Sequence, residues 1–199
     1  MQRRQAERSD TTRRAIVDAA RTLFAELGFE RTSIDQVAEA AGVSKGALYH
    51  HYRDKTEVLA AVYEDMARDM ARRLVAAVEP VESPLEQVEA GSLFFLDTCT
   101  APAYARIALV DAPAALGWER WRQIDCDAGG FGLLQAGLRA AADAGEARAD
   151  HLDQRAHLLV ATLVESAQLI ARSDSPAATR TAVAELIHEQ VEALRHPPA

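Results

Sequence analysis

The chain has 199 residues, 49% of them apolar, and a formal net charge of −8, so it is long enough to bury a substantial core. No apolar run approaches the roughly 20 residues needed to cross a bilayer, and the basic N-terminus lacks the apolar stretch of a secretory signal, so we expect a cytoplasmic protein. Cys99 and Cys126 are too few for a disulfide framework, and no two histidines are spaced i, i+4 to share a metal ion. We expect neither a metal nor another cofactor.

The charge is unevenly distributed along the chain. Residues 1–55 carry 10 Lys and Arg against 8 Asp and Glu, whereas residues 56–199 carry 12 against 22. A polyanion would be attracted to the first quarter of the chain and repelled by the rest, although an ordinary solvated surface would give the same split.

An amphipathic helix is predicted from about residue 11, after a segment, residues 1–9, that we expect to be disordered. Apolar residues then recur at the spacing of one buried helix face: Ile16, Ala20, Leu23, Phe24 and Leu27. Gly28 is placed to end this helix in a left-handed conformation.

Two further short helices are predicted, separated by a tight turn. Ser33 and Gln36, three residues later, form a capping box, and Gly42 is placed to close this second helix. Ser44 is placed to cap the third helix. Two short helices joined by a glycine-containing turn of about three or four residues form a helix-turn-helix.

The third helix is predicted to have one buried and one exposed face. With 3.6 residues per turn, the residues that face inward are Val43, Ala47, Leu48, His51 and Tyr52. The residues that face outward are Lys45, Gly46, Tyr49, His50 and Arg53.

The rest of the chain also has helical periodicity, without strand alternation or repeats. A long helix is predicted up to Val78, before Pro80, and another begins at Pro84 after the capping residue Ser83. Pro102 and Pro113 divide the following segment into short pieces, and Gly129-Gly130 marks a weak point. The sequence therefore predicts an all-α fold with an N-terminal three-helix domain, residues 1–55, followed by a helical domain, residues 56–199.

The last two predicted helices carry long, wide apolar stripes. These stripes could complete the core of one subunit or form a bundle with the same pair of helices from a second subunit. For a dimer interface we expect Leu159, Leu163, Ala167, Ile170, Val183, Leu186, Ile187 and Val191.

The run TSIDQVAEAAGVSKGALYHHYRDKTEVLAAV resembles the DNA-binding region of the tetracycline-repressor (TetR) family of bacterial transcription regulators. The resemblance covers about residues 11–60, and beyond it only the helical architecture is similar. The family usually has phenylalanine at the position of Tyr52. The resemblance implies a homodimeric regulator that binds a palindromic double-stranded DNA operator, with a C-terminal domain that binds a small-molecule effector and dimerises.

Residues that match the motif are expected to contact DNA. Hydroxyl groups beside helix N-termini can donate to phosphate, Lys45 can donate to a guanine edge, and Gly46 allows close approach to the groove. Lys55 resembles the phosphate-clamping lysine of the family. The expected DNA contacts are Thr32, Ser33, Ser44, Lys45, Gly46, Ala47, Tyr49, His50 and Lys55.

Large aromatic residues concentrate in the proline- and glycine-broken stretch between residues 94 and 131. Broken helices leave room for an apolar ligand cavity, although the same aromatics could simply be core. The expected effector pocket contains Phe94, Phe95, Thr98, Cys99, Tyr104, Trp118, Trp121 and Phe131. Arg106, Asp111 and Gln135 are further polar candidates.

The sequence contains no combination of nucleophile, base and orienting group, so we do not expect an enzyme. A small-molecule carrier that uses only the C-terminal domain is one alternative to a regulator. A redox sensor that uses Cys99 and Cys126 is another, although neither cysteine has an obviously basic setting.

Overall fold

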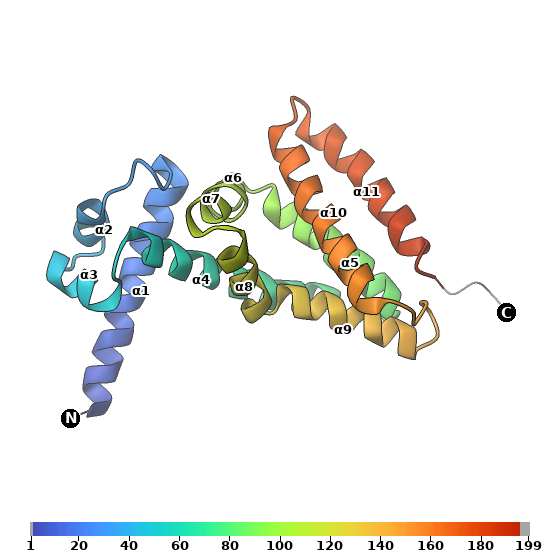
Figure 1. Ribbon diagram of the computed structural model, residues 1–199, viewed down its shortest axis with the longest axis horizontal. Coiled ribbons are helices and arrows are strands. Elements are labelled where there is room, and N and C mark those ends of the chain that lie inside the picture. The colour runs from blue at the N-terminus through green and yellow to red at the C-terminus, as the bar shows by residue number, and fades with distance from the viewer. Residues whose placement is uncertain (1, 196–199) are drawn as a thin grey trace. The chain divides into compact units, whose positions relative to one another are not determined.

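The computed structural model describes the backbone of residues 2–195 and the side chains of residues 9–195. These residues form helices joined by loops and no β-strand, which confirms the predicted all-α class (Figure 1). The elements are α1 (Gln2–Leu27), α2 (Ile34–Ala40), α3 (Lys45–His51), α4 (Lys55–Val78), α5 (Pro84–Cys99), α6 (Pro102–Tyr104), η1 (Ala105–Asp111), α7 (Ala112–Leu116), α8 (Trp118–Ala128), α9 (Gly130–Asp143), α10 (Leu152–Arg172) and α11 (Pro176–Glu192).

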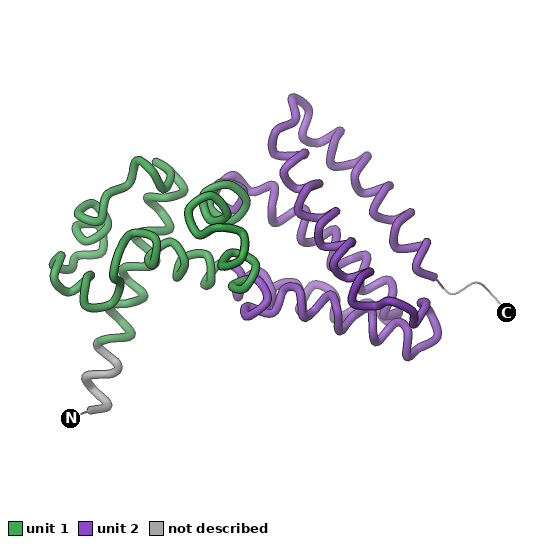
Figure 2. Tube along the Cα trace, in the orientation of Figure 1, with its two compact units in different colours: residues 1–66, 106–124 green, residues 67–105, 125–199 purple. Residues whose placement is uncertain are grey.

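The chain divides into two compact units (Figure 2). Unit 1 contains the residues up to Met66 together with Arg106–Ile124, and unit 2 contains Ala67–Ala105 and the residues from Asp125 onward. The division therefore differs from the expected boundary between residues 55 and 56. The first half of α4 belongs to unit 1. A second segment, Arg106–Ile124, also belongs to unit 1, because η1, α7 and most of α8 pack with the N-terminal helices.

Helix α1 begins at Gln2, so the expectation of disorder over residues 1–9 is wrong for the part that the structure describes; Met1 lies outside it. This segment is rich in Gln, Arg, Ala and Glu, which favour helix, and it contains neither glycine nor proline. The expected apolar stripe of α1 faces the core, where the ring centroids of Phe24 and Phe29 lie 5.6 Å apart. The other large buried side chains of unit 1 include Ile16, Val37, Leu48, Tyr52, Val58, Leu59 and Val62.

In unit 2, α5, α9, α10 and α11 pack around a core that all four helices supply. Helix α5 starts as predicted, with Pro84 in its first turn and the Ser83 hydroxyl accepting a hydrogen bond from the Glu86 amide. Glu146 adds a second cap, because its Oε2 accepts from the Ser83 hydroxyl at 2.6 Å and from the Leu85 amide at 3.0 Å. These two hydrogen bonds, the first above all, lower the pKa of Glu146.

The predicted weak point at Gly129-Gly130 separates α8 from α9. Gly129 has φ of 99°, in the left-handed region that favours glycine, and this conformation ends one helix and starts the next. The segment between Pro102 and Pro113 contains η1, a π-helix of seven residues. π-Helical turns are rare and often lie at functional sites.

Among the described residues, no single helix is both long and apolar enough to span a membrane. One pair of helical segments reaches that length and apolar composition when the two are taken together, but the pair is sharply bent at a break: Pro84–Cys99 and Pro102–Leu116. The side chains that the structure describes include no group of three or more His, Cys, Asp or Glu residues able to hold a metal ion.

Candidate nucleic-acid interface

The helix-turn-helix is held by its own capping residues. The predicted capping box is present: the Ser33 hydroxyl accepts from the Gln36 amide at 3.2 Å, and the Gln36 side chain accepts from the Ser33 amide at 2.8 Å. At the other end of α2, Gly42 has φ of 65°, and the Val43 amide donates to the Ala38 carbonyl at 3.0 Å. This pattern is a Schellman motif, which ends α2 and turns the chain directly into α3.

Helix α3 presents the face that the periodicity predicts. Leu48 is fully buried and Tyr52 is 5% exposed, so these two side chains anchor the helix to unit 1. The expected outward set is exposed: Lys45, Gly46, Tyr49, His50 and Arg53. Tyr49 is 48% exposed, so its phenol group is accessible from solvent.

Gly46 adds no side chain to this face, and a Cβ atom at this position would meet no heavy atom closer than the Ser44 hydroxyl oxygen at 4.0 Å. The protein's own packing therefore does not require glycine here. Its expected role, to let DNA approach the backbone, is compatible with this open position and remains a prediction.

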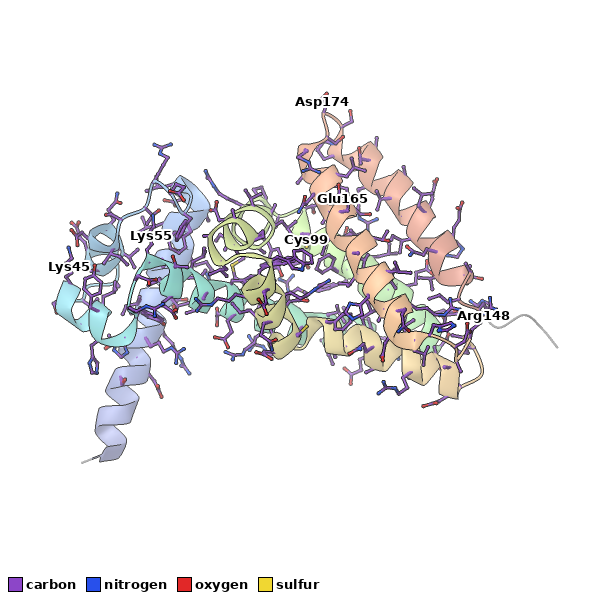
Figure 3. The ribbon with its side chains drawn as sticks, viewed as in Figure 1. Lys45, Lys55, Cys99, Arg148, Glu165 and Asp174 are labelled. Carbon is purple, nitrogen blue, oxygen red and sulfur yellow. The ribbon has the colours of Figure 1, made fainter. Side chains whose placement is uncertain are left out.

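Lys45 is paired with Asp35 of α2. The Lys45 Nζ lies 2.7 Å from Asp35 Oδ1, and both side chains are more than half exposed. The hydrogen bond to Asp35 raises the pKa of Lys45. Figure 3 shows Lys45 on the outer side of α3. Asp35 was not among the residues predicted for the site, and its position in the first turn of α2, close to the N-terminus of α3, could have identified it.

Thr32 does not belong to the exposed surface. Its side chain is 1% exposed, and its hydroxyl donates to the Gly28 carbonyl at 2.8 Å. The prediction that this hydroxyl donates to a phosphate is therefore wrong. It instead holds the loop after α1 closed, because a buried hydroxyl must find a partner within the protein.

Ser33 and Ser44 are exposed, as expected, but both hydroxyl oxygens also cap helices. Ser33 Oγ lies 3.0 Å from Gln36 Oε1, so the hydroxyl proton of Ser33 points back into its own capping box. Ser44 accepts from the Ala47 amide at 3.1 Å, which leaves its hydroxyl proton directed elsewhere. Of the two, Ser44 is better placed to donate to a phosphate.

Lys55, at the start of α4, is bound to the loop that follows α1. Its Nζ donates to the carbonyl oxygen of Phe29 at 2.7 Å and to that of Glu30 at 3.3 Å, and it lies 4.2 Å from the centroid of the Phe29 ring. Figure 3 shows this side chain beside the N-terminal helices. An ammonium group has three protons, so a phosphate contact is still possible, but Lys55 also stabilises the domain.

Tyr52, at the position where the resemblance leads us to expect phenylalanine, contacts α1 through its hydroxyl. Arg13 Nε donates to the Tyr52 hydroxyl oxygen at 3.3 Å. Burial raises the pKa of Tyr52, although the hydrogen bond from Arg13 acts in the opposite direction. The departure from the family pattern therefore adds a link between α1 and the end of α3.

The C-terminal end of α1 is capped by η1, which the sequence did not indicate. Arg106 Nη1 donates to the carbonyl oxygens of Ala25 and Glu26, both at 3.2 Å. Asp111 Oδ2 accepts from the Phe29 amide at 3.0 Å. Gly28 has φ of 87°, in the left-handed region that favours glycine. A Cβ there would lie 3.0 Å from Arg106 Nη2, so the guanidinium group would have to shift. Arg106 and Asp111, expected as pocket residues, thus hold the helix-turn-helix domain.

The expected effector residues divide between the two units. In unit 1, Trp121 is buried, and its ring stacks on that of Tyr63 with 6.3 Å between the ring centroids. Its Nε1 donates to the Ala108 carbonyl at 2.9 Å. These contacts make Trp121 a core residue. Trp118 is 64% exposed, with its ring 5.0 Å from that of Trp121 and beside an open depression lined by Leu116–Arg120 and Gln123.

The other effector candidates lie in unit 2, where Phe94, Phe95, Thr98 and Tyr104 are half-buried and Cys99 and Phe131 are buried. Burial raises the pKa of the Cys99 thiol far above its usual value, and the charge of Asp125 adds to this. The pKa of Tyr104 is raised by burial, with Cys99 and Asp125 as smaller causes. The Gln135 side chain, a further polar candidate, forms a hydrogen bond elsewhere: its Nε2 donates to Asp153 Oδ1 at 3.2 Å.

The residues expected at a dimer interface mostly face the core of their own subunit. Seven of the eight are no more than 5% exposed: Leu159, Leu163, Ala167, Ile170, Val183, Ile187 and Val191. Leu186 is 61% exposed. The apolar stripe of a helix identifies a buried face but does not tell which neighbour buries it, and here unit 2 does so itself. The exposed large apolar side chains of α10 and α11 are Leu158, Leu169 and Leu186.

Two seven-residue helices, joined by a tight turn and presenting a polar face from the second helix, define a helix-turn-helix protein of the DNA-binding class. Comparison with known proteins gives the family. Residues 16–62 match the family described as bacterial regulatory proteins, tetR family, and residues 85–194 match the tetracyclin repressor-like C-terminal domain. The chain belongs to the TetR family of regulators.

Individual relatives are similar over different parts of the chain. The transposon Tn10 TetC protein of Escherichia coli is 42% identical over 60 residues, 30% of this chain and 30% of TetC. The transcriptional regulator CymR of Pseudomonas putida is 32% identical over 118 residues, 57% of this chain and 58% of CymR. The matched regions thus span less than two thirds of either relative. A crystal structure of a TetR-family transcriptional regulator from Pectobacterium atrosepticum has a TM-score of 0.82 and 27% identity, covering 97% of this chain and 98% of that one.

Proposed function

We propose that this protein is a homodimeric transcriptional repressor that binds a palindromic DNA operator and is released from it by a small apolar or aromatic effector. The observation that carries the proposal is the exposed polar face of α3, with Lys45, Gly46, Tyr49 and His50 pointing outward from a helix that Leu48 and Tyr52 anchor. A helix of this kind can enter the major groove, where lysine donates to guanine and phenol or imidazole groups bond phosphates or base edges.

A dimer is needed for specificity. Each good base contact discriminates by about 1–3 kcal/mol, and a single α3 makes too few of them to select one site in a genome. Two such helices about 34–36 Å apart, or somewhat more, would read half-sites in successive major grooves, which makes the operator palindromic. The excess of acidic residues after residue 55 would keep non-specific DNA binding low.

The outward faces of α10 and α11 are the best candidates for the dimer interface. Leu158 and Leu169 are 66% and 51% exposed and lie eleven residues apart, so they share one face of α10. Leu186 is the exposed leucine of α11. An interface that buries these side chains against the same helices of a second subunit would remove a conspicuous apolar surface from water.

For the effector we propose a site in unit 2 close to Phe94, Phe95, Thr98, Cys99, Tyr104 and Phe131. The proposal rests on the sequence pattern, in which these aromatic residues alternate with a few polar ones as in apolar ligand sites, and on the burial of Cys99 and Phe131. Helix η1 follows α5 and α6 directly in the chain, so a ligand that rearranges this segment would alter the hold of Arg106 and Asp111 on α1. That change would shift the population of the DNA-binding conformation.

The direct test is footprinting on the DNA that flanks the protein's own gene. We expect protection of a palindromic site, and a ligand that raises the melting temperature should weaken the protection. Ligand binding without protection of any DNA would favour a small-molecule carrier instead. A change of DNA affinity on oxidation would favour a redox sensor, although the raised pKa of Cys99 makes its thiol a poor nucleophile.

A further inference from the structure

The ion pair between Asp35 and Lys45 joins the two helices of the helix-turn-helix at their exposed N-terminal turns. Asp35 lies in the first turn of α2, and Lys45 is the first residue of α3. The Nζ to Oδ1 distance is 2.7 Å, with side-chain exposures of 56% for Lys45 and 67% for Asp35. Such an exposed pair contributes little to stability, because water competes for both charges and the long lysine side chain loses rotamer freedom. Its main consequence is the position of the ammonium group.

The two side chains present a donor and an acceptor next to each other. An ammonium group has three protons, and Asp35 takes one, so two remain for other acceptors. The second carboxylate oxygen of Asp35, Oδ2, can accept a further hydrogen bond. A ligand that fits this pair must present hydrogen-bond acceptors to the Lys45 ammonium group and, next to them, a donor to the Asp35 carboxylate.

The major-groove edge of a G·C base pair has this order. Guanine presents two acceptors, N7 and O6, and the cytosine amino group beside them is a donor. An A·T pair places the adenine amino group and then thymine O4 at the corresponding positions, so it would set a donor against Lys45 and an acceptor against Asp35. A reversed G·C pair presents the order backwards. One orientation of one base pair is thus favoured.

We propose that Asp35 is a specificity-determining residue that reads, together with Lys45, one G·C base pair in each operator half-site. This inference rests on the proposed DNA-binding function. The carboxylate of Asp35 accepts from the cytosine amino group while it holds the Lys45 ammonium toward guanine. The same negative charge repels phosphate and competes with it for Lys45, so it also lowers the affinity for unrelated DNA.

The experiment uses the full-length protein and a pool of DNA duplexes with a randomised central region. Sites selected by the unmodified protein, by Asp35→Asn and by Asp35→Glu are sequenced, and affinities for the best duplex and for a scrambled duplex are measured at several salt concentrations. Asp69→Asn serves as the charge-matched control, because Asp69 is also half-exposed and paired with an arginine, Arg72, but lies outside the helix-turn-helix.

For Asp35→Asn we expect the G·C preference at one symmetric position to fall about tenfold, within the range for a single base contact. Affinity for the scrambled duplex should rise about two- to fivefold, with a steeper dependence on salt, because a repulsive charge is lost. Asp35→Glu should retain most of the preference, and Asp69→Asn should behave like the unmodified protein. Unchanged melting temperatures would show that the effects do not arise from unfolding.

The inference is overturned if Asp35→Asn selects the same sites as the unmodified protein with an unchanged ratio of the two affinities. It is also overturned if the unmodified protein selects a palindrome in which no symmetric position shows a G·C preference. In either case the proposed function stands, since a palindrome was still selected. Failure of the unmodified protein to enrich any sequence would instead contradict the proposed function itself.

Discussion

Asp111 accepts a hydrogen bond from the backbone amide of Phe29 at 3.0 Å, although 82 residues separate them in the chain. Arg106, from the same π-helix, binds the last carbonyl groups of α1. The helix-turn-helix domain is therefore completed by a segment that the sequence places far beyond it. Helix η1, which follows α5 and α6 in the chain, is therefore hydrogen-bonded directly to the helix-turn-helix domain.

Replacement of Asp111 by alanine should destabilise unit 1. The Phe29 amide would lose its acceptor, and an unsatisfied buried donor costs about 1–3 kcal/mol, so the melting temperature should fall by several degrees. Asp174→Ala, in the exposed turn between α10 and α11, is the control and should change the melting temperature little. An Asp111→Ala protein as stable as the unmodified one would show that the amide finds another partner without cost.

Lys45 and Lys55 should respond differently to substitution by alanine. Lys45→Ala should alter the preference at one base position and leave the melting temperature unchanged, because its ion pair is exposed. Lys55→Ala should lower the melting temperature, because the carbonyl groups of Phe29 and Glu30 lose their donor. If Lys55 also clamps phosphate, this variant should weaken binding to all sequences about equally and reduce the salt dependence. Equal specificity changes for the two variants would contradict these separate roles.

The Tyr52 hydroxyl should contribute little to stability compared with the Tyr52 ring. Tyr52→Phe removes the acceptor for Arg13, which is exposed enough to be rehydrated, so we expect a loss of no more than about 1 kcal/mol in the free energy of unfolding. Denaturant titration measures this loss. Tyr52→Ala, which also removes the buried ring, should cost about 3–5 kcal/mol. Similar losses for the two variants would contradict the assignment of Tyr52 as mainly a packing residue.

A charge at Leu186 should break the proposed dimer. The side chain is 61% exposed in the subunit, so Leu186→Lys should fold normally, while burying the ammonium group between two subunits would be costly. Sedimentation should show more monomer, and operator affinity should fall. Val75→Lys, also at an exposed apolar residue but on α4, is the control. Unchanged assembly of Leu186→Lys would place the interface on another surface.

The stabilising effect of Glu146 should depend on pH. Its pKa is lowered in the folded protein, chiefly by the hydrogen bond from Ser83, so its contribution is present above the ordinary carboxyl pKa of about 4.3 and is lost as the pH falls through the lowered value. The melting temperature of Glu146→Gln should therefore be lower than that of the unmodified protein at pH 7. The difference should shrink below about pH 4. Glu82→Gln, at an exposed position nearby, should show no such trend.

The sequence by itself determined the helical class, most of the local helix caps and the exposed face of α3. Gly28, Ser33, Gly42 and Ser44 act within a few residues of their own positions, so local capping rules were sufficient to predict the C-terminal end of α1, both ends of α2 and the start of α3. The exposed side of α3 followed from a period of 3.6 residues. Ser83 as the cap of α5 and the break at Gly129-Gly130 were also predicted, because both depend on residues next to the helix end.

Only the tertiary structure decided which distant groups meet. Arg106 bound the end of α1, Asp111 bound the loop that follows it, and the stripes of α10 and α11 were buried within their own unit. Packing also buried Thr32, whose hydroxyl donates to the nearby Gly28 carbonyl. The periodicity of apolar residues predicts that one face of a helix is buried, but it does not identify the helix that buries it. Hydrogen bonds between residues some 80 positions apart depend on the packing of whole helices, and no local pattern in the sequence records that packing.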